Sequence, residues 1–154
     1  MRSSPKSMAQ IGGQPFLAYQ LDLLRNQGFT EIILCTGYLS KAIEEYFGDG
    51  RDFGVHLSYF VEEKPLGTAG AIKNAAPLID STFLVLNGDT YIQADLRNLV
   101  YFHQNRGALA TIGLSQVGDV SRSGLVQVDR AGRVVRFMEK GTVQVDCSTI
   151  SAGV

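Results

Sequence analysis

The stretch TFLVLNGDTY, residues 82–91, determines how the rest of the sequence is interpreted. Its first five residues are apolar or β-branched and predict a buried strand over residues 82–86. Asn87 and Gly88 end this strand, and the carboxylate of Asp89 follows directly. Ligands of open α/β sheets collect at the carboxyl ends of strands, so we expect Asp89 to lie at a binding site. The same residues also fit a plain hairpin turn with a solvated carboxylate.

Helical and strand patterns alternate on both sides of this stretch. Helices are expected over residues 15–27, 40–48, 67–76 and 95–106, and further strands over residues 30–36 and 55–62. This alternation predicts an α/β fold: a three-layer sandwich with a mostly parallel sheet and helices on both faces.

The pattern changes after Gly107, where three strands with short connections are expected, the first of them over residues 108–114. Two of them, residues 124–129 and 133–140, are joined by a turn and predict an antiparallel hairpin extension of the same sheet. The chain starts without a strand before its first helix and ends on residues 150–154, which resemble the start of another strand. We therefore expect a single domain over residues 1–154 that is unfinished at both ends.

Size and composition are those of a soluble globular protein. The 154 residues suit one core, 45% of them are hydrophobic, and the net charge of −1 offers no broad basic face for nucleic acid. No apolar run approaches the ~18 residues of a membrane span, and no hydrophobic signal region is present, so we expect a cytoplasmic protein without a membrane partner. Cys35 and Cys147 form no metal-binding or disulfide pattern; we expect both to be reduced and Cys35 to pack in the core.

A second candidate site is the segment EEKPLGTAGA, residues 62–71. The helix expected here opens with Gly67, Thr68, Ala69 and Gly70, which carry little side chain. The free N–H groups of such a helix start suit a phosphate, and the bare backbone suits a flat nucleobase. Tight packing of helix on sheet would select the same residues. Neither a P-loop nor a GxGxxG fingerprint occurs in the sequence.

Two lysines are weaker candidates. Lys6 follows Pro5 just before the first helix, and Lys140 follows Glu139 at the end of the last long strand. A single lysine is usually a solvated surface charge, so each gains weight only together with the two candidates above.

Together these segments resemble the sugar-1-phosphate nucleotidyltransferases, a family with a Rossmann-like α/β core. The matching segments are PKSMAQIGGQPFLAYQLDLL, TGY with EEYFGDG, EEKPLGTAGAIKNA, FLVLNGDT, GLVQVDRAGRVVRFMEK and ISAGV, which cover essentially the whole chain. The resemblance is closest to the heptose 1-phosphate and mannose-1-phosphate guanylyltransferases, although cytidylyl- and thymidylyltransferases look similar.

The resemblance implies a role for each candidate. Asp89 matches the aspartate that binds Mg²⁺ with the nucleotide phosphates, and Lys6 matches a lysine that contacts phosphate, so these two are the implied catalytic residues. The implied nucleotide-binding residues are Gly67, Thr68, Ala69, Gly70, Asn87 and Gly88. The implied sugar-phosphate-binding residues are Gly124, Glu139, Lys140, Ser151, Ala152 and Gly153.

The sequence also departs from the family pattern. Nothing corresponds to the opening strand and its GGxGTRL loop, since Gly12 and Gly13 match an ordinary turn, and a second metal-binding aspartate normally lies beyond the segment matching ISAGV. Gly141 replaces a usual proline, and Ser123 replaces a common tyrosine. We therefore expect the chain to lack the N-terminal strand with its loop and the C-terminal part, and to turn over weakly or not at all alone.

The implied reaction transfers a nucleotidyl group, guanylyl first, from a nucleoside triphosphate to a sugar 1-phosphate and releases pyrophosphate, in nucleotide-sugar biosynthesis for surface polysaccharide. The attacking phosphate has a second pKa near 6 and needs no general base at pH 7. His56 and His103 are accordingly assigned to packing or to the surface. Beyond the two substrates, self-association into a homo-oligomer is the remaining candidate partnership.

Two other functions fit parts of the pattern. One is a non-catalytic homologue that holds a nucleotide or sugar phosphate. The other is a glycosyltransferase of the related nucleotide-sugar-binding fold, which usually carries a D-x-D metal motif; residues 89–91, Asp-Thr-Tyr, do not supply it.

Overall fold

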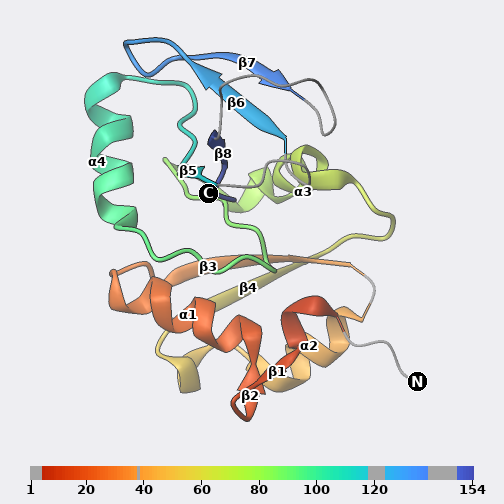
Figure 1. Cartoon of the computed structure of the whole chain (residues 1–154). Coiled ribbons are helices and arrows are strands. Elements are labelled where there is room, and N and C mark those ends of the chain that lie inside the picture. Colours follow the sequence, from red (N-terminus) through yellow and green to blue (C-terminus); the bar gives the residue numbers. More distant parts are fainter. Residues whose placement is uncertain (1–4, 38, 118–123, 139–148) are drawn as a thin grey trace. The chain divides into compact units, whose positions relative to one another are not determined.

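The computed structural model describes residues 5–37, 39–117, 124–138 and 149–154 (Figure 1). The chain divides into two compact units, Met1–Phe83 and Leu84–Val154, and each is described by itself. A single domain over residues 1–154 stays a prediction. Among the described helices, none is long and apolar enough to cross a membrane.

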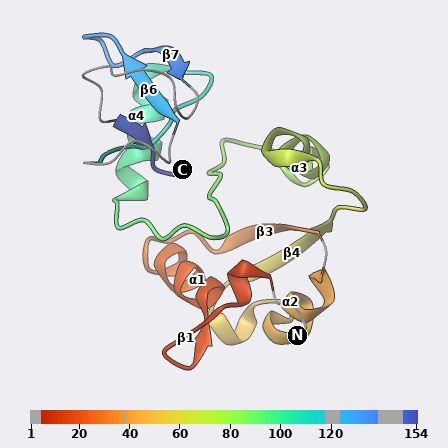
Figure 2. The same cartoon turned by 45° about the vertical axis from the view of Figure 1, so that its right-hand side comes forward.

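The first unit is built on one parallel strand pair. Strands β3 (Glu31–Thr36) and β4 (His56–Val61) run parallel, with Glu31 opposite His56 and Thr36 opposite Val61. Helices α1 (Phe16–Asn26) and α2 (Ser40–Phe47) lie on one face of this pair, and α3 (Gly67–Ala75) lies on the other (Figures 1 and 2). The expected parallel pairing and three-layer order are therefore present in this unit.

Apolar stripes from both layers form the core of the first unit. Successive side chains of a strand point to opposite faces, which turns alternate residues of β3 and β4 toward α1 and α2. The buried cluster consists of Leu17, Ala18, Leu21, Ile43, Phe47, Val55 and Leu57, with Met8, Ile32, Leu34, Phe53 and Tyr59 packed against it. The α1 side chains in this cluster lie on one side of the helix, which is the side that is buried.

Helix α1 ends at Asn26, one residue before the predicted end at residue 27. The N–H of Gly28 donates to the carbonyl of Arg25 and the N–H of Phe29 to the carbonyl of Leu24, both at 2.9 Å. This pair of bonds is a Schellman motif, which requires the left-handed conformation that Gly28 adopts with φ +85°. The helix begins one residue later than expected, because Pro15 caps it with an extended backbone.

The minor elements of the first unit are short. They are η1 (Lys6–Met8), β1 (Gln10–Ile11), β2 (Gln14–Pro15), η2 (Arg51–Phe53) and η3 (Ala76–Leu78). Gly12 and Gly13 join β1 to β2 with φ values of +58° and +93°, the geometry of a tight type I′ hairpin turn. The prediction of an ordinary turn at these two glycines is confirmed.

The second unit pairs one helix with an antiparallel sheet. Its elements are α4 (Leu96–Arg106), β5 (Leu114–Gln116), β6 (Leu125–Val128), β7 (Val134–Met138) and β8 (Thr149–Ser151), and the sheet order is β5-β8-β6-β7. Helix α4 is capped at both ends: an oxygen of the Asp95 carboxylate accepts the N–H of Asn98 at 2.9 Å, and Gly107 follows the last turn with φ +56°.

The predicted hairpin between β6 and β7 is confirmed. Asp129 Oδ1 accepts the backbone N–H groups of Ala131 and Arg133 at 2.9 and 2.8 Å, while Gly132 closes the turn with φ +78°. The hairpin belongs to the four-stranded antiparallel sheet and not, in the described part of the chain, to an extension of the parallel pair.

Three local expectations are wrong. Residues 82–86 and 108–113 form no strand, and no described strand pairs with them. A pattern of apolar residues reports the tendency to be extended, whereas strand formation also needs a hydrogen-bonding neighbour. Cys35 is exposed and lies on the face opposite the core, with its Sγ 3.9 Å from the carbonyl oxygen of Ala71 in α3.

Truncating Leu21 tests the assignment of the core. Leu21 is fully buried and Leu78 is 52% exposed, so Leu21→Ala should lower the free energy of unfolding by about 3–5 kcal/mol and Leu78→Ala by less than ~1 kcal/mol. Urea unfolding followed by circular dichroism measures both variants. Similar losses in the two variants would contradict the core described above.

Candidate functional site

A tight turn carries the predicted metal ligand in the second unit. The N–H of Thr90 donates to the carbonyl of Asn87 at 3.4 Å, which places Gly88 and Asp89 at the centre of the turn. Asp89 is exposed. The alternative prediction, that these residues form a turn, is therefore correct for the backbone. Among the described strands, however, no pair is joined by this turn, so it is not a hairpin turn.

Backbone hydrogen bonds join this turn to the predicted sugar-phosphate segment. The N–H of Asn87 donates to the carbonyl of Gly153 at 3.0 Å. Gly113 then holds the same segment on its other side: its N–H donates to Val154 and its carbonyl accepts from Ala152, both at 2.8 Å. Asn87 and the Ser151–Gly153 segment, far apart in the sequence, thus lie side by side.

Gly153 fits this contact because it lacks a side chain. Its φ of +86° is a conformation that favours glycine, and a Cβ atom there would lie 3.0 Å from Nδ2 of Asn87 and 3.5 Å from Cβ of Thr90. Its N–H also donates to the hydroxyl oxygen of Ser151 at 3.3 Å. We call this contact the Asn87–Gly153 junction and residues 151–153 the SAG segment. The junction therefore requires glycine at position 153.

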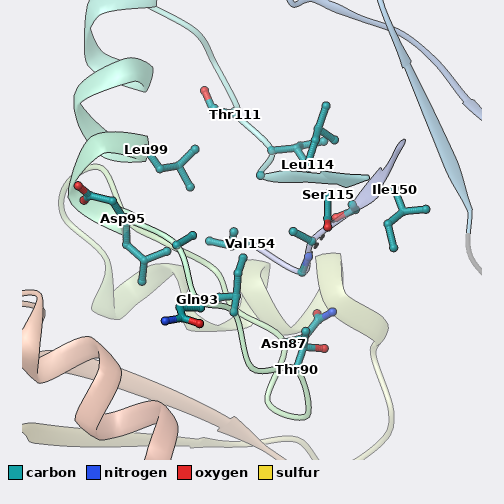
Figure 3. A pocket seen from close by; sticks show the side chains of 18 of the residues that line it. Asn87, Thr90, Gln93, Asp95, Leu99, Thr111, Leu114, Ser115, Ile150 and Val154 are labelled. Carbon is teal, nitrogen blue, oxygen red and sulfur yellow. Dashed lines mark hydrogen bonds between the residues drawn. The ribbon is translucent and has the colours of Figure 1, made fainter. Parts of the chain in front are cut away.

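A pocket of about 950 Å³ adjoins the junction (Figure 3). Its walls come from the loop before α4, from α4, from residues 111–115 and from the end of the chain. Asn87, Ser151, Ala152 and Gly153 line it, together with apolar side chains such as Leu99. Its volume is at the upper end of the range of small-molecule sites. Asp89 is not among the residues that line it.

Asp89 can supply one ligand of a metal ion. Within the described residues there is no group of three or more His, Cys, Asp or Glu side chains that could hold a metal. Mg²⁺ is usually bound by one or two carboxylates together with substrate phosphates and water. The exposed carboxylate of Asp89 fits this mode of binding, in which the metal reaches the protein together with a phosphate ligand.

The other predicted nucleotide residues lie in the first unit, at the start of α3. Gly67, Thr68 and Ala69 are exposed, and nothing lies within 4 Å of a Cβ atom placed on Gly67. A Cβ on Gly70 would meet Cβ of Leu66 at 2.6 Å, a residue of the preceding loop and not of the sheet. Packing of helix on sheet thus does not explain these small residues, and the first turn of α3 is open to a ligand.

The remaining predicted residues are placed as follows. Lys6 is exposed on η1 in the first unit. Gly124 precedes β6, where a Cβ atom would lie 3.2 Å from the carbonyl oxygen of Met138. Glu139 and Lys140 lie outside the described residues.

The two histidines contact protein groups. His56 lies 3.2 Å from the carboxylate of Glu31 on the surface of the strand pair. Nδ1 of His103 lies 2.9 Å from the hydroxyl of Thr111. His56 is exposed and His103 is half-buried, which agrees with their assignment to the surface or to packing.

Two polar residues at the carboxyl ends of β3 and β4 were missed by the sequence analysis. Thr36 is 7% exposed, and its buried hydroxyl oxygen has no hydrogen-bond partner among the described residues. Glu62 directly follows β4, and its N–H donates to the carbonyl of Thr36 at 2.7 Å. Their position in the sequence could have revealed them. Each stands at the carboxyl end of an apolar strand, where ligands of α/β sheets bind.

Two groups of the first unit have perturbed acidities. Burial, and then the charge of Glu62, raises the pKa of the Cys35 thiol. Burial raises the pKa of Tyr59 as well, with smaller contributions from Glu44 and Asp49, and its hydroxyl donates to the carbonyl of Gly48 at 2.7 Å. Negative charge and partial shielding from water both disfavour the ionised forms.

Comparison with known proteins connects these features to one family. The family model described as nucleotidyl transferase matches residues 1–154. The chain is 41% identical to a mannose-1-phosphate guanylyltransferase of Mycobacterium tuberculosis over 98% of its own length and 42% of that protein. It is also 41% identical to a D-glycero-alpha-D-manno-heptose 1-phosphate guanylyltransferase of Aneurinibacillus thermoaerophilus, over 89% of this chain and 59% of the relative.

A solved structure gives the same result. The crystal structure of HddC from Yersinia pseudotuberculosis complexed with GMP-PN matches 98% of this chain and 66% of its own, with a TM-score of 0.82 and 32% identity. This similarity confirms the Rossmann-like α/β fold class. The chain spans about half the length of the curated relatives it matches.

Gly153→Ala tests the junction against a matched variant, Gly132→Ala. Both glycines have positive φ, so each alanine should cost about 1–2 kcal/mol of unfolding free energy. Only the Cβ on residue 153 approaches the Asn87 side chain. In ¹⁵N–¹H spectra the side-chain amide of Asn87 should therefore shift in Gly153→Ala and stay in place in Gly132→Ala; equal spectra for Asn87 would contradict the junction.

The pKa of the Cys35 thiol should be higher in the folded chain than in the unfolded chain. In a Cys147→Ser background, the pH at which its reaction with a disulfide reagent reaches half its maximum rate should be higher in the folded chain than in urea. Because Glu62 raises this pKa, Glu62→Gln should move the midpoint downward. Identical midpoints in folded and unfolded chains would refute the shielding.

Proposed function

Because the chain belongs to the nucleotidyl transferase family, we propose that it serves in the transfer of a nucleotidyl group from a nucleoside triphosphate to a sugar 1-phosphate, with release of pyrophosphate. Guanylyl is the proposed group, since two of its relatives are named guanylyltransferases. The observation that carries the proposal is the match of the family model to residues 1–154. The hydrogen bond between Asn87 and Gly153 supports it from the structure.

Asp89 is the proposed ligand of Mg²⁺. When bound, Mg²⁺ would neutralise phosphate charge and align the phosphates. The exposed position of Asp89 at the centre of a tight turn leaves its carboxylate accessible to a metal that arrives with the nucleotide. Lys6, exposed on η1, would add positive charge for a phosphate oxygen.

The opening turn of α3 is the proposed nucleobase site. The first N–H groups of a helix lack partners within it, and Gly67, Thr68 and Ala69 leave that backbone exposed. Gly70 completes the set with little steric bulk. Asn87 and Gly88 would contact the nucleotide from the metal-binding turn, with the backbone of Gly88 open to close approach because nothing lies within 4 Å of a Cβ placed there.

Residues around the Asn87–Gly153 junction are proposed for the sugar phosphate. Ser151, Ala152 and Gly153 line the pocket of about 950 Å³, which offers polar groups from the chain end and apolar contacts from α4. Gly124, Glu139 and Lys140 are proposed for the same substrate on the family resemblance. A dianionic phosphate is already nucleophilic at pH 7, so no histidine is assigned a proton transfer.

Substrate binding and product formation test the proposal. The chain is titrated with GTP, UTP, CTP and dTTP with and without Mg²⁺, then incubated with each nucleotide and mannose 1-phosphate or a heptose 1-phosphate while pyrophosphate is measured. Saturable, Mg²⁺-dependent binding with GTP preferred is expected, whereas nucleotide sugar should form slowly or not at all from this chain alone. Binding without product in a chimaera that supplies the remaining parts of a relative's chain would favour the non-catalytic homologue; absence of Mg²⁺-dependent nucleotide binding would overturn the proposal. The proposal also includes a cytoplasmic location for the protein and its association with further copies of itself.

Replacing Asp89 tests the metal assignment. Asp89→Asn keeps the shape of the side chain and removes its charge, so Mg²⁺-dependent GTP binding should weaken roughly tenfold or more, which corresponds to ~1.4 kcal/mol. Asp80→Asn, at another exposed position, is the matched control and should leave binding unchanged. Calorimetric titration measures both, and an equal affinity for the two variants would rule out Asp89 as the ligand.

A further inference from the structure

Tyr19 lies near the start of α1 and contacts the hairpin that precedes this helix. The side chains of an α-helix lean toward its N-terminus, so a long side chain near the start can reach the preceding segment. The hydroxyl of Tyr19 donates to the carbonyl oxygen of Ile11 at 2.8 Å. Ile11 is the last residue of β1, and the turn formed by Gly12 and Gly13 follows it directly. This hydrogen bond therefore holds the β1–β2 hairpin against α1.

The turn of the hairpin lies close to the same hydroxyl. A Cβ atom on Gly12 would lie 2.9 Å from the hydroxyl oxygen of Tyr19, which is closer than these atoms normally approach. Nothing lies within 4 Å of a Cβ atom placed on Gly13. Both glycines have positive φ, but only Gly12 must also lack a side chain because of its neighbour. The fit between Tyr19 and the hairpin thus depends on the first glycine of the turn.

The hairpin is continuous with the short helix that carries Lys6. The N–H of Ala9 donates to the carbonyl of Lys6 at 3.1 Å and closes η1, and the N–H of Phe16 donates to the carbonyl of Ala9 at 2.9 Å. The side chain of Met8 packs against the core cluster of the first unit. This segment is therefore attached to the unit by a side chain, by a backbone hydrogen bond and, through the hairpin, by the hydroxyl of Tyr19.

These attachments determine the position of η1. A single helical turn is unfavourable by itself, because it fixes several backbone dihedral angles for one hydrogen bond. The three residues of η1 therefore keep their place through contacts with the rest of the unit. Removing one hydrogen bond of ordinary strength should raise the population of displaced conformations about fivefold.

We propose that Tyr19 is a positioning residue for phosphate binding: its hydrogen bond to the carbonyl of Ile11 holds the β1–β2 hairpin, and with it η1, where Lys6 can reach a phosphate oxygen. This inference rests on the proposed function, which assigns a phosphate contact to Lys6. Tyr19 acts through the backbone, because its hydroxyl donates its hydrogen to a carbonyl oxygen.

Amide exchange tests the attachment without any ligand. Tyr19→Phe removes only the hydroxyl, and Tyr59→Phe is the matched control, because the hydroxyl of Tyr59 donates to the carbonyl of Gly48 at 2.7 Å elsewhere in the same unit. Exchange at the amides of Met8 and Ala9, which form η1, should accelerate about fivefold in Tyr19→Phe and less than about twofold in Tyr59→Phe. Equal exchange rates at these two amides in the two variants would overturn the proposal.

The close fit at Gly12 gives a second test of the contact. Gly12→Ala should lower the urea midpoint of unfolding more in wild type than in a Tyr19→Phe background, because the hydroxyl that its Cβ atom would meet is then absent. Gly13→Ala should lower the midpoint equally in both backgrounds. An equal effect of Gly12→Ala in the two backgrounds would contradict the contact on which the proposed role of Tyr19 depends.

Nucleotide binding tests whether Tyr19 acts through Lys6. The dissociation constant of GTP with Mg²⁺ should rise about fivefold in Tyr19→Phe and stay within about twofold of wild type in Tyr59→Phe. In a Lys6→Gln chain, Tyr19→Phe should cause no further loss of affinity. Additive losses in the double variant would show that Tyr19 acts independently of Lys6 and would refute the proposal. Absence of GTP binding in wild type would overturn the proposed function and this role with it, whereas the exchange rates test the attachment of η1 independently.

Discussion

The second unit depends on a set of three backbone hydrogen bonds. They join Asn87 to Gly153, Gly113 to Val154 and Ala152 to Gly113. Through them, a turn with an exposed carboxylate is fixed against the end of the chain, although neither segment belongs to a long strand. Glycine is required at the contact because of its positive φ and because a Cβ atom would meet Asn87. Backbone hydrogen bonds thus help to position the turn that carries the proposed metal ligand.

In the first unit, a side-chain hydrogen bond fixes the segment that carries the other candidate site. Its parallel pair ends in polar residues, and the carboxylate of Glu62 connects the end of β4 to the start of α3. The short, exposed first turn of that helix has no side-chain cap of its own. Both candidate sites therefore consist of small residues held by hydrogen bonds from a neighbouring segment. Such sites leave room for a ligand while limiting the backbone conformations that glycine would otherwise sample.

Local features of the fold were predictable from the sequence, and long-range pairing was not. The ends of α1 and α4 were predicted to within one residue because the caps that set them depend on a few neighbouring residues. The turn that joins β6 to β7 was correct for the same reason. The strand expected at residues 82–86 failed because its formation depends on a partner strand. Cys35 was wrongly assigned to the core for a related reason: alternation along β3 does not say which face carries the buried cluster.

The candidate site was only partly predictable. Asp89 and the small residues of α3 stood out by position and composition, whereas Ser151–Gly153 entered through family resemblance alone. The contact between Gly153 and Asn87 could not be read from spacing, because it joins segments distant in sequence. Glu62 was missed because its hydrogen bond is to a backbone N–H, and a sequence pattern does not reveal where a side chain turns.

The central claim, that the Asn87 turn binds a metal with the nucleotide and lies against residues 151–153, can be tested by substituting Mn²⁺ for Mg²⁺ in the presence of GTP. Paramagnetic Mn²⁺ broadens the amide resonances of nearby residues. The account predicts that residues 87–90 and 151–153 broaden together at substoichiometric metal, while the amides of α2 stay sharp. Broadening elsewhere in the second unit that spares both segments would contradict it.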